Sequence, residues 1–196
     1  MEKAVAMIRA FIALDLPPAT HQALAVLQRE WEQLKAPVAW VKSDKIHLTL
    51  KFLGNISPEQ VAGIQSGLGD VASRTTPFRL QPKACGAFPS IKQMRVIWMG
   101  LSGALDALHS LQQEVEKGLT ALDFPPEERS FRGHLTLGRV KGRRHLYQLQ
   151  EALLKHQSFQ AEAFDVREIV LYRSELRPEG ARYTSLFRAG LSGPSH

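Results

Sequence analysis

The tetrapeptide His-Leu-Thr-Leu occurs twice in this chain, at residues 47–50 and again at residues 134–137. On a β-strand, successive side chains point to opposite faces, so each histidine shares a face with the threonine two residues later. The leucines of each copy then lie on the other face and belong to a core. If two such strands lie opposite each other, two imidazoles and two hydroxyls meet at one cleft.

A pair of imidazoles is suited to proton transfer at a phosphorus atom. Histidine titrates near pH 6.5, so one ring can be protonated while its neighbour is neutral. On either side of a phosphodiester, His47 and His134 would act as general acid and general base, each transfer being worth about 10²–10⁴ in rate. Thr49 and Thr136 would donate hydrogen bonds to the non-bridging oxygens without adding charge.

Cationic groups beside the motifs would neutralise the charge of the phosphate. Strict alternation from His47 places Lys51 on the face of the histidine. Strict alternation from His134 places Arg139 on the opposite face, and a bulge at Gly138 would be needed to turn that guanidinium towards the cleft. The alternation alone therefore supports a place in the cleft less well for Arg139 than for Lys51.

A metal-dependent reaction is the alternative use of such histidines. Each motif supplies one ligand, and no Asp, Glu or Cys stands at ligand spacing beside either copy. Because zinc sites usually need at least three protein ligands, we expect no metal and no cofactor. Surface or packing roles are expected for the five other histidines, which fall on predicted helices or in the tail: His21, His109, His145, His156 and His196.

The composition is that of a globular chain, with 44% hydrophobic and 22% charged residues among 196. We expect a single domain with a sizeable core. The only cysteine, Cys85, is expected to be a small buried side chain in a reducing compartment. No apolar run approaches the roughly 18 residues of a membrane span, and no signal peptide is recognisable, so cytoplasm is the default expectation.

The formal net charge is +6, and the excess gathers around the second motif. Basic surfaces attract partners that carry phosphate. A solvated basic face is the simpler interpretation, but here the cluster flanks a candidate catalytic histidine, which favours an anion site. Its members are Arg129, Arg132, Arg139, Lys141, Arg143 and Arg144.

Strand and helix patterns alternate along the chain, and the order repeats. The first half predicts a strand over 9–16, a helix carrying Leu24 to Leu34, a motif strand over 46–53 with a turn at 54–55, a helix starting at Ser57, and a strand over 78–85. The second half predicts a strand over 95–101, a helix capped by Ser102, a motif strand over 134–140, a helix carrying Leu146 to Leu153, and strands over 159–172 and 183–188.

The two halves correspond at a nearly constant offset. His134 follows His47 by 87 residues, and Val96 follows Phe11, in the opening strands, by 85. An internal duplication explains this agreement. We therefore expect an α+β fold of one domain, residues 1–196, built from duplicated βαβαβ units related by a pseudo-twofold axis. The lobe-forming repeats are expected at about 8–88 and 94–188.

Three stretches carry a family resemblance: Arg-Ala-Phe-Ile-Ala-Leu at 9–14, the first motif through Gly54, and Phe-Arg-Gly followed by the second motif at 131–139. They resemble the two-histidine (2H) phosphoesterase superfamily, and within it the RNA 2′,3′-cyclic phosphodiesterase family, historically called 2′-5′ RNA ligase. The resemblance covers essentially the whole chain. One departure is Gly133, where the family often has proline.

The resemblance implies metal-independent hydrolysis of a terminal 2′,3′-cyclic phosphate of RNA to a 2′-phosphate. By carry-over, His47 is the proton donor to the departing 3′ oxygen and His134 is the proton acceptor that activates water. Thr49 and Thr136 hold the phosphate, and Arg139 matches a phosphate- or nucleotide-contacting arginine. The implied partners are RNA 3′ ends with a cyclic phosphate, tRNA fragments among them, and no membrane. We expect a monomer.

Several alternatives stay open. Some members of the family join 2′-5′ linked tRNA halves reversibly, with the acid and base roles exchanged. Another 2H activity, on a small cyclic nucleotide or on 2′-5′ oligoadenylate, is the second hypothesis, and a non-enzymatic RNA-binding module is the third. Phe131, Trp40 and Tyr172 are candidates for stacking on a nucleobase.

Overall fold

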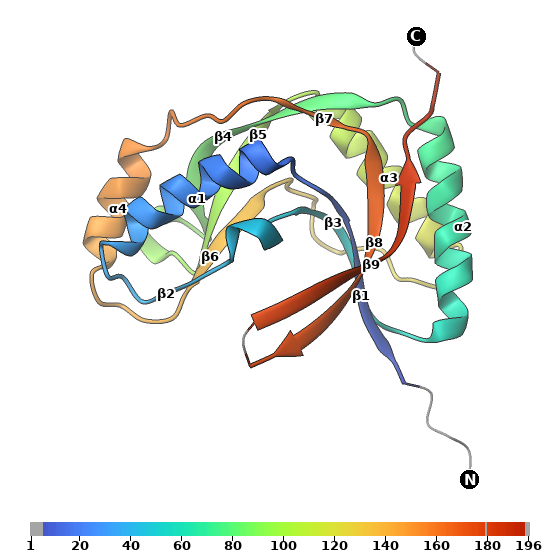
Figure 1. Cartoon of the computed structure of the whole chain (residues 1–196), viewed down its shortest axis with the longest axis horizontal. Coiled ribbons are helices and arrows are strands. Elements are labelled where there is room, and N and C mark those ends of the chain that lie inside the picture. The colour runs from blue at the N-terminus through green and yellow to red at the C-terminus, as the bar shows by residue number, and fades with distance from the viewer. Residues whose placement is uncertain (1–5, 179, 195–196) are drawn as a thin grey trace.

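The computed structural model describes residues 6–178 and 180–194. In this part of the chain an antiparallel sheet of nine strands runs in the order β7-β4-β5-β6-β3-β1-β8-β9, and β2 pairs with β6 (Figure 1). The strands are β1 (Ile8–Leu14), β2 (Val38–Trp40), β3 (Leu48–Ile56), β4 (Phe78–Phe88), β5 (Val96–Gly103), β6 (Leu135–Val140), β7 (Phe164–Val166), β8 (Glu168–Arg177) and β9 (Gly180–Gly190).

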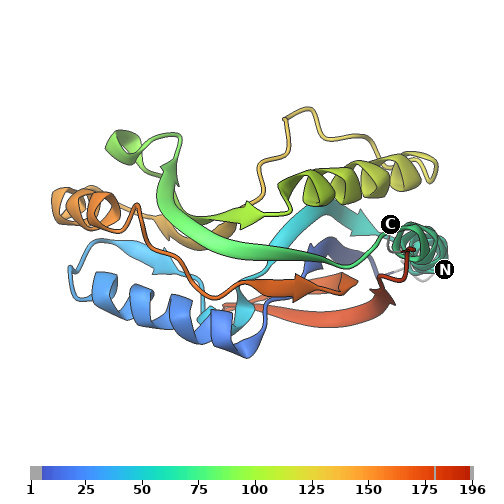
Figure 2. The same cartoon turned by 90° about the horizontal axis from the view of Figure 1, so that it is seen from above.

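In the described residues four α-helices cover the sheet, namely α1 (Pro18–Glu32), α2 (Pro58–Arg74), α3 (Leu105–Thr120) and α4 (Leu146–Lys155). Helices α1 and α4 gather at one end of the molecule, and α2 and α3 at the other (Figure 1, Figure 2). The apolar stripes expected from the sequence face the core, where Leu24, Ile64 and Leu108 are buried. Among the residues described, no helix is both long and apolar enough to cross a bilayer.

The duplication is visible in the topology. The first unit is β1-α1-β3-α2-β4 and the second is β5-α3-β6-α4-β8, and their motif strands β3 and β6 meet at Leu48 and Leu135. The expected bilobal α+β fold with pseudo-twofold symmetry is confirmed. Each unit gives its last strand to the other lobe, because β4 pairs with β5 and β8 pairs with β1.

The helix starts show which local signals decide structure. At α2, Gln60 accepts a hydrogen bond from the backbone N–H of Ser57, so the predicted capping pattern is present. At α3 the prediction was wrong, since Ser102 is still part of β5 and its hydroxyl donates to the carbonyl of Gln81. The strand continues through Gly103, whose φ of +98° turns the chain into the helix.

The first motif strand is longer than expected. Residues 54–55 do not turn the chain but pair with Ala10 and Arg9 of β1, and the strand ends only at Ile56. Gly54 adopts a φ of +71° next to a shift in the pairing register, so its glycine signal marks an irregularity within the strand rather than a turn. A second difference concerns the expected strand over 159–172, which is divided into the two strands β7 and β8.

Candidate active site

The two motif histidines line one cleft of about 390 Å³ at the junction of β3 and β6. Thr49, Thr136 and Arg139 line the same cleft, so the fold brings together all five residues expected from the sequence. The leucines between them are buried on the other face, as the alternation predicts. Residues of the β8–β9 hairpin form a further wall of the cleft.

The two imidazoles are held in the same way. Nδ1 of His47 lies 2.9 Å from the carbonyl oxygen of Lys45, and Nδ1 of His134 lies 2.7 Å from the carbonyl oxygen of Arg132. A carbonyl can only accept, so each Nδ1 carries hydrogen and donates it. This tautomer leaves Nε2 of each ring as the atom that can take up or release a proton.

A bulge in β6 turns Arg139 into the cleft. Thr136 pairs with Trp98 and Gly138 pairs with Ile97, so Leu137 is an extra residue between them. A bulge of the kind that Gly138 could permit is therefore present, and it moves the next side chain to the face of the histidine. Glycine is required beside it, because a Cβ at Gly138 would lie 2.6 Å from Val38 of β2.

The bulge is stabilised from outside the strand. The carbonyl oxygen of Leu137 accepts hydrogen bonds from Nε2 of Gln28, at 2.9 Å, and from the backbone N–H of Val41, at 2.9 Å. Gln28 is a buried residue of α1. A backbone oxygen that the bulge removes from the ladder is thus fully paired, which avoids the cost of burying it unsatisfied.

An equivalent bulge in β3 turns Lys51 away from the cleft. The expectation that Lys51 shares the face of His47 is therefore wrong. Thr49 pairs with Ala13 and Lys51 pairs with Ile12, which leaves Leu50 as the extra residue. Lys51 is only 3% exposed. Its Nζ donates to the carboxylate of Glu116 at 2.6 Å and to the carbonyl of Pro125 at 2.8 Å, as an interior ion pair.

Phe52 takes the place in β3 that Arg139 has in β6. Each is the fifth residue after its motif histidine, each follows a bulge, and both line the cleft. Phe52 was not among the residues expected at the site. The sequence feature that could have identified Phe52 is its position five residues after the histidine, the same as that of Arg139. This position indicates the cleft only once the bulge is known.

Aromatic rings surround the imidazole of His47. Phe11 stacks on it at 4.7 Å between centroids, and Tyr183 meets it edge-on at 5.3 Å. Tyr172 stacks on Phe11 at 5.3 Å and lies 6.5 Å from the imidazole. Burial among these rings lowers the pKa of His47, while the Lys45 carbonyl and the charge of Asp15 act in the opposite direction. Burial therefore favours the neutral form of His47.

Comparison with known proteins identifies the family of this chain. The model of the family described as LigT-like phosphoesterase matches residues 14–98 and again residues 101–183, once for each half. The chain belongs to this family.

Two of the relatives that are called RNA 2′,3′-cyclic phosphodiesterase match most of this chain. The protein from Methanothermobacter thermautotrophicus is 31% identical over 91% of this chain and 96% of its own length. The protein from Aeropyrum pernix is 33% identical over 87% and 97%.

The fold of this LigT-like phosphoesterase also matches solved structures. The crystal structure of TT0787 from Thermus thermophilus superposes with a TM-score of 0.79 at 25% identity, and the match covers 96% of this chain and 100% of the other. Among the residues described here, no group of three or more His, Cys, Asp and Glu side chains is arranged to hold a metal ion.

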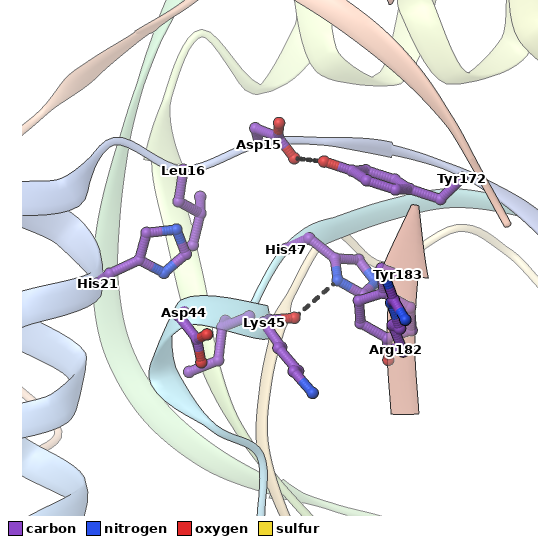
Figure 3. Close-up of a pocket in the computed structure, with 10 residues that line it drawn as sticks. Asp15, Leu16, His21, Asp44, Lys45, His47, Tyr172, Arg182 and Tyr183 are labelled. Carbon is purple, nitrogen blue, oxygen red and sulfur yellow. Dashed lines mark hydrogen bonds between the residues drawn. The ribbon is translucent and has the colours of Figure 1, made fainter. Parts of the chain in front are cut away.

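A second cavity adjoins the cleft of this LigT-like phosphoesterase. It measures about 300 Å³ and shares Lys45, His47 and Tyr183 with the cleft (Figure 3). On its far side the hydroxyl of Tyr172 donates to the carboxylate of Asp15 at 2.6 Å (Figure 3). The ring of His47 therefore lies between two spaces, one containing its partner histidine and one bordered by carboxylates.

The three aromatic residues that were candidates for stacking on a nucleobase do not line the cleft. Phe131 packs edge-on against His109, and Trp40 packs against Trp31. Tyr172 faces the second cavity. Aromatic residues are often part of the core, and a sequence does not show which ones face a ligand.

Proposed function

We propose that this LigT-like phosphoesterase hydrolyses the terminal 2′,3′-cyclic phosphate of RNA to a 2′-phosphate, with His47 as proton donor and His134 as proton acceptor. The observation that carries the proposal is the shared cleft, in which both imidazoles are held through Nδ1 and keep Nε2 free. Relatives named RNA 2′,3′-cyclic phosphodiesterase support the choice of substrate.

The reaction is one in-line displacement. Nε2 of His134 takes a proton from water, the water oxygen bonds to phosphorus, and the bond from phosphorus to the 3′ oxygen breaks. The departing oxygen takes the proton of His47 Nε2, so one histidine gains the charge that the other loses. Thr49 and Thr136 donate to the non-bridging oxygens, and Arg139 balances their negative charge.

The lowered pKa of His47 fits this role once substrate is bound. Burial by itself favours the neutral ring. A phosphodiester anion placed against the imidazole is an opposite charge, which favours the protonated form and raises the pKa. The arrival of substrate therefore shifts the donor towards its protonated form.

Joining of RNA ends through a 2′-5′ linkage uses the same groups, with the 5′-hydroxyl of a second RNA end in place of water. His134 would deprotonate that hydroxyl and His47 would protonate the departing 3′ oxygen, whereas the two roles are exchanged in the reverse cleavage of the linkage. This joining is included in the proposal, with tRNA fragments among the substrates. We propose a monomer, because both motif histidines, both threonines and Arg139 of a single chain line the same cleft.

Product analysis on an RNA oligonucleotide ending in a 2′,3′-cyclic phosphate tests the proposal. We expect a 2′-phosphate, formed at an undiminished rate in EDTA. His47→Ala and His134→Ala should each lower kcat by about 10²–10⁴-fold while RNA binding persists. His109→Ala, which removes an exposed imidazole outside the cleft, is the matched control.

Other products would change the conclusion. A 3′-phosphate would mean that the 2′ oxygen leaves. Turnover of a cyclic mononucleotide or of 2′-5′ oligoadenylate alone would assign a different 2H activity. Binding of RNA without turnover of any of these substrates would leave a binding module, and wild-type rates in both histidine variants would refute the acid–base assignment.

A further inference from the structure

A further cavity of about 520 Å³ lies where β5 begins and β6 ends, at the end of the molecule that carries α4 (Figure 1). Its wall includes the cationic side chains of Lys92, Arg95 and Arg143, and among the described residues no Asp or Glu lines it. We call this space the basic cavity. It contains none of the residues assigned to the reaction, so its charge needs another explanation.

The three cations of the basic cavity have no acidic partner. Exposed arginines on other parts of the surface form ion pairs with carboxylates, as Arg79 and Arg167 do with Asp165. In the described part of the chain, no such pair includes a side chain of the basic cavity. Like charges gathered without a counter-charge repel one another, and an anionic ligand would relieve that repulsion.

The charge of the basic cavity matches that of the catalytic cleft. The cleft is lined by Arg9, Lys45 and Arg139 and, among the described residues, by no Asp or Glu. The second cavity differs from both, because Asp15 and Asp44 form part of its wall. Carboxylates repel a phosphate, whereas arginine and lysine side chains donate charge-assisted hydrogen bonds to its oxygens. The basic cavity is therefore suited to a phosphate group.

The basic cavity lies on the His134 side of the cleft. The ring of Phe88 meets the imidazole of His134 edge-on, with 5.0 Å between centroids. The carbonyl oxygen of Phe88 accepts a hydrogen bond from the backbone N–H of Arg95 at 2.7 Å, and the carbonyl oxygen of Arg95 accepts one from Val140 of β6 at 2.9 Å. The rings around His47 come instead from β1, β8 and β9, on the opposite side of the motif strands.

The His134 side is the one from which the attacking group approaches, a step that rests on the proposed function. When RNA ends are joined, the 5′-hydroxyl oxygen of a second RNA bonds to phosphorus and its proton passes to Nε2 of His134. The bond from phosphorus to the 3′ oxygen breaks, and that oxygen takes the proton of His47. Attacking and leaving oxygens lie on opposite sides of phosphorus in an in-line displacement. The second RNA therefore enters on the side where the basic cavity lies.

We propose that the basic cavity binds a backbone phosphate of the second RNA, the strand that supplies the attacking 5′-hydroxyl. Phosphate contacts of this kind fix the position of a strand without reading its sequence. Water needs no such site, so hydrolysis does not depend on the cavity. The basic cluster around the second motif thus serves two strands, because Arg139 meets the reacting phosphate and Arg143 meets the backbone of the incoming strand.

The test measures joining and hydrolysis with the same donor, an RNA oligonucleotide that ends in a 2′,3′-cyclic phosphate. Two acceptors with a free 5′-hydroxyl are compared below saturation: an RNA oligonucleotide, and a nucleoside, which has no phosphate. Wild-type enzyme should join the oligonucleotide about tenfold faster or more, as expected for hydrogen bonds to a charged group. In Arg143→Gln and in Lys92→Gln this advantage should fall towards one, while kcat/KM for hydrolysis stays at the wild-type value.

Arg144→Gln is the matched control, because it removes the neighbouring positive charge, which is exposed but does not line the basic cavity. It should keep the wild-type advantage of the oligonucleotide over the nucleoside. Circular dichroism checks that each variant is folded. An equal loss of this advantage in Arg143→Gln and Arg144→Gln would mean that the cavity is not the site.

Other results would also overturn the proposal. Wild-type enzyme might join both acceptors equally well, or hydrolyse the donor and join neither. Arg143→Gln might keep the advantage, or lose hydrolysis of the donor as strongly as joining, in which case the cavity holds the donor strand. Absence of both reactions in wild-type enzyme would refute the proposed function itself, and this proposal with it.

Discussion

The ring of Phe11 lies nearly parallel to the imidazole of His47, with 4.7 Å between centroids and 26° between planes. The corresponding residue in the second half is Val96, since Phe11 pairs with Phe52 as Val96 pairs with Arg139. His134 meets Phe88 edge-on instead. The duplication therefore supplies two like histidines, and the surrounding side chains make their environments different.

Replacing Phe11 by alanine should raise the pKa of His47 towards 6.5, because water then reaches the ring and charging it costs less. With His47 as donor, the protonated fraction of free enzyme falls as pH rises through this pKa. The corresponding limb of kcat/KM should therefore move to higher pH in Phe11→Ala. An NMR titration of the His47 ring measures the pKa directly.

Phe88→Ala is the control for this prediction, since it alters the neighbour of the other histidine. It should leave the titration of His47 where it is in the wild type. If Phe11→Ala leaves that titration in place as well, burial by the ring is not what lowers the pKa.

Replacing Lys51 by methionine should destabilise the fold without disabling the chemistry. Glu116 would lose the cation at 2.6 Å and remain as an interior carboxylate, and breaking such a pair typically costs about 3–5 kcal/mol. Urea denaturation measures the loss of free energy of unfolding. A second change, Glu116→Leu, should restore much of it. A fall in kcat without a change in stability would return Lys51 to the cleft, where strict alternation placed it.

Replacing Arg139 by methionine should raise KM about tenfold or more, because a hydrogen bond to a charged group contributes about 1.5–3 kcal/mol. The dependence of KM on salt should weaken at the same time. Lys141→Met removes the same charge two residues later, outside the cleft, and is the control. Equal effects of both variants would mean that general basic charge, and not a contact at the phosphate, attracts the substrate.

The sequence predicts the chemistry of the site better than its geometry. His47 and Thr49 share a face because a period of two is a local property of a strand. Whether the side chains of Lys51 and Arg139 point into the cleft depends on bulges. The bulge in β6 in turn depends on Gln28 from a distant helix. Arg139 was assigned by resemblance rather than by alternation.

The local pattern also could not predict which strands pair with one another. The βαβαβ order is read from apolar spacing, but the pairing of β4 with β5 and of β8 with β1 joins segments far apart in the chain. Phe52 was missed for a related reason. Its apolar type suggests a core, and only the shift of register in β3 brings it to the surface.

The crossed pairing of the final strands also bears on how the molecule assembles. As the polypeptide leaves the ribosome, β1 and β3 emerge early, but β8 and β9, which complete their side of the sheet, emerge last. Neither half therefore has all its neighbours until synthesis is nearly over, and contacts so distant in sequence are slow to form. The cleft is likewise complete only with the closing stretch of the chain, because β8 and β9 supply one of its walls, so a product truncated before them lacks a finished pocket.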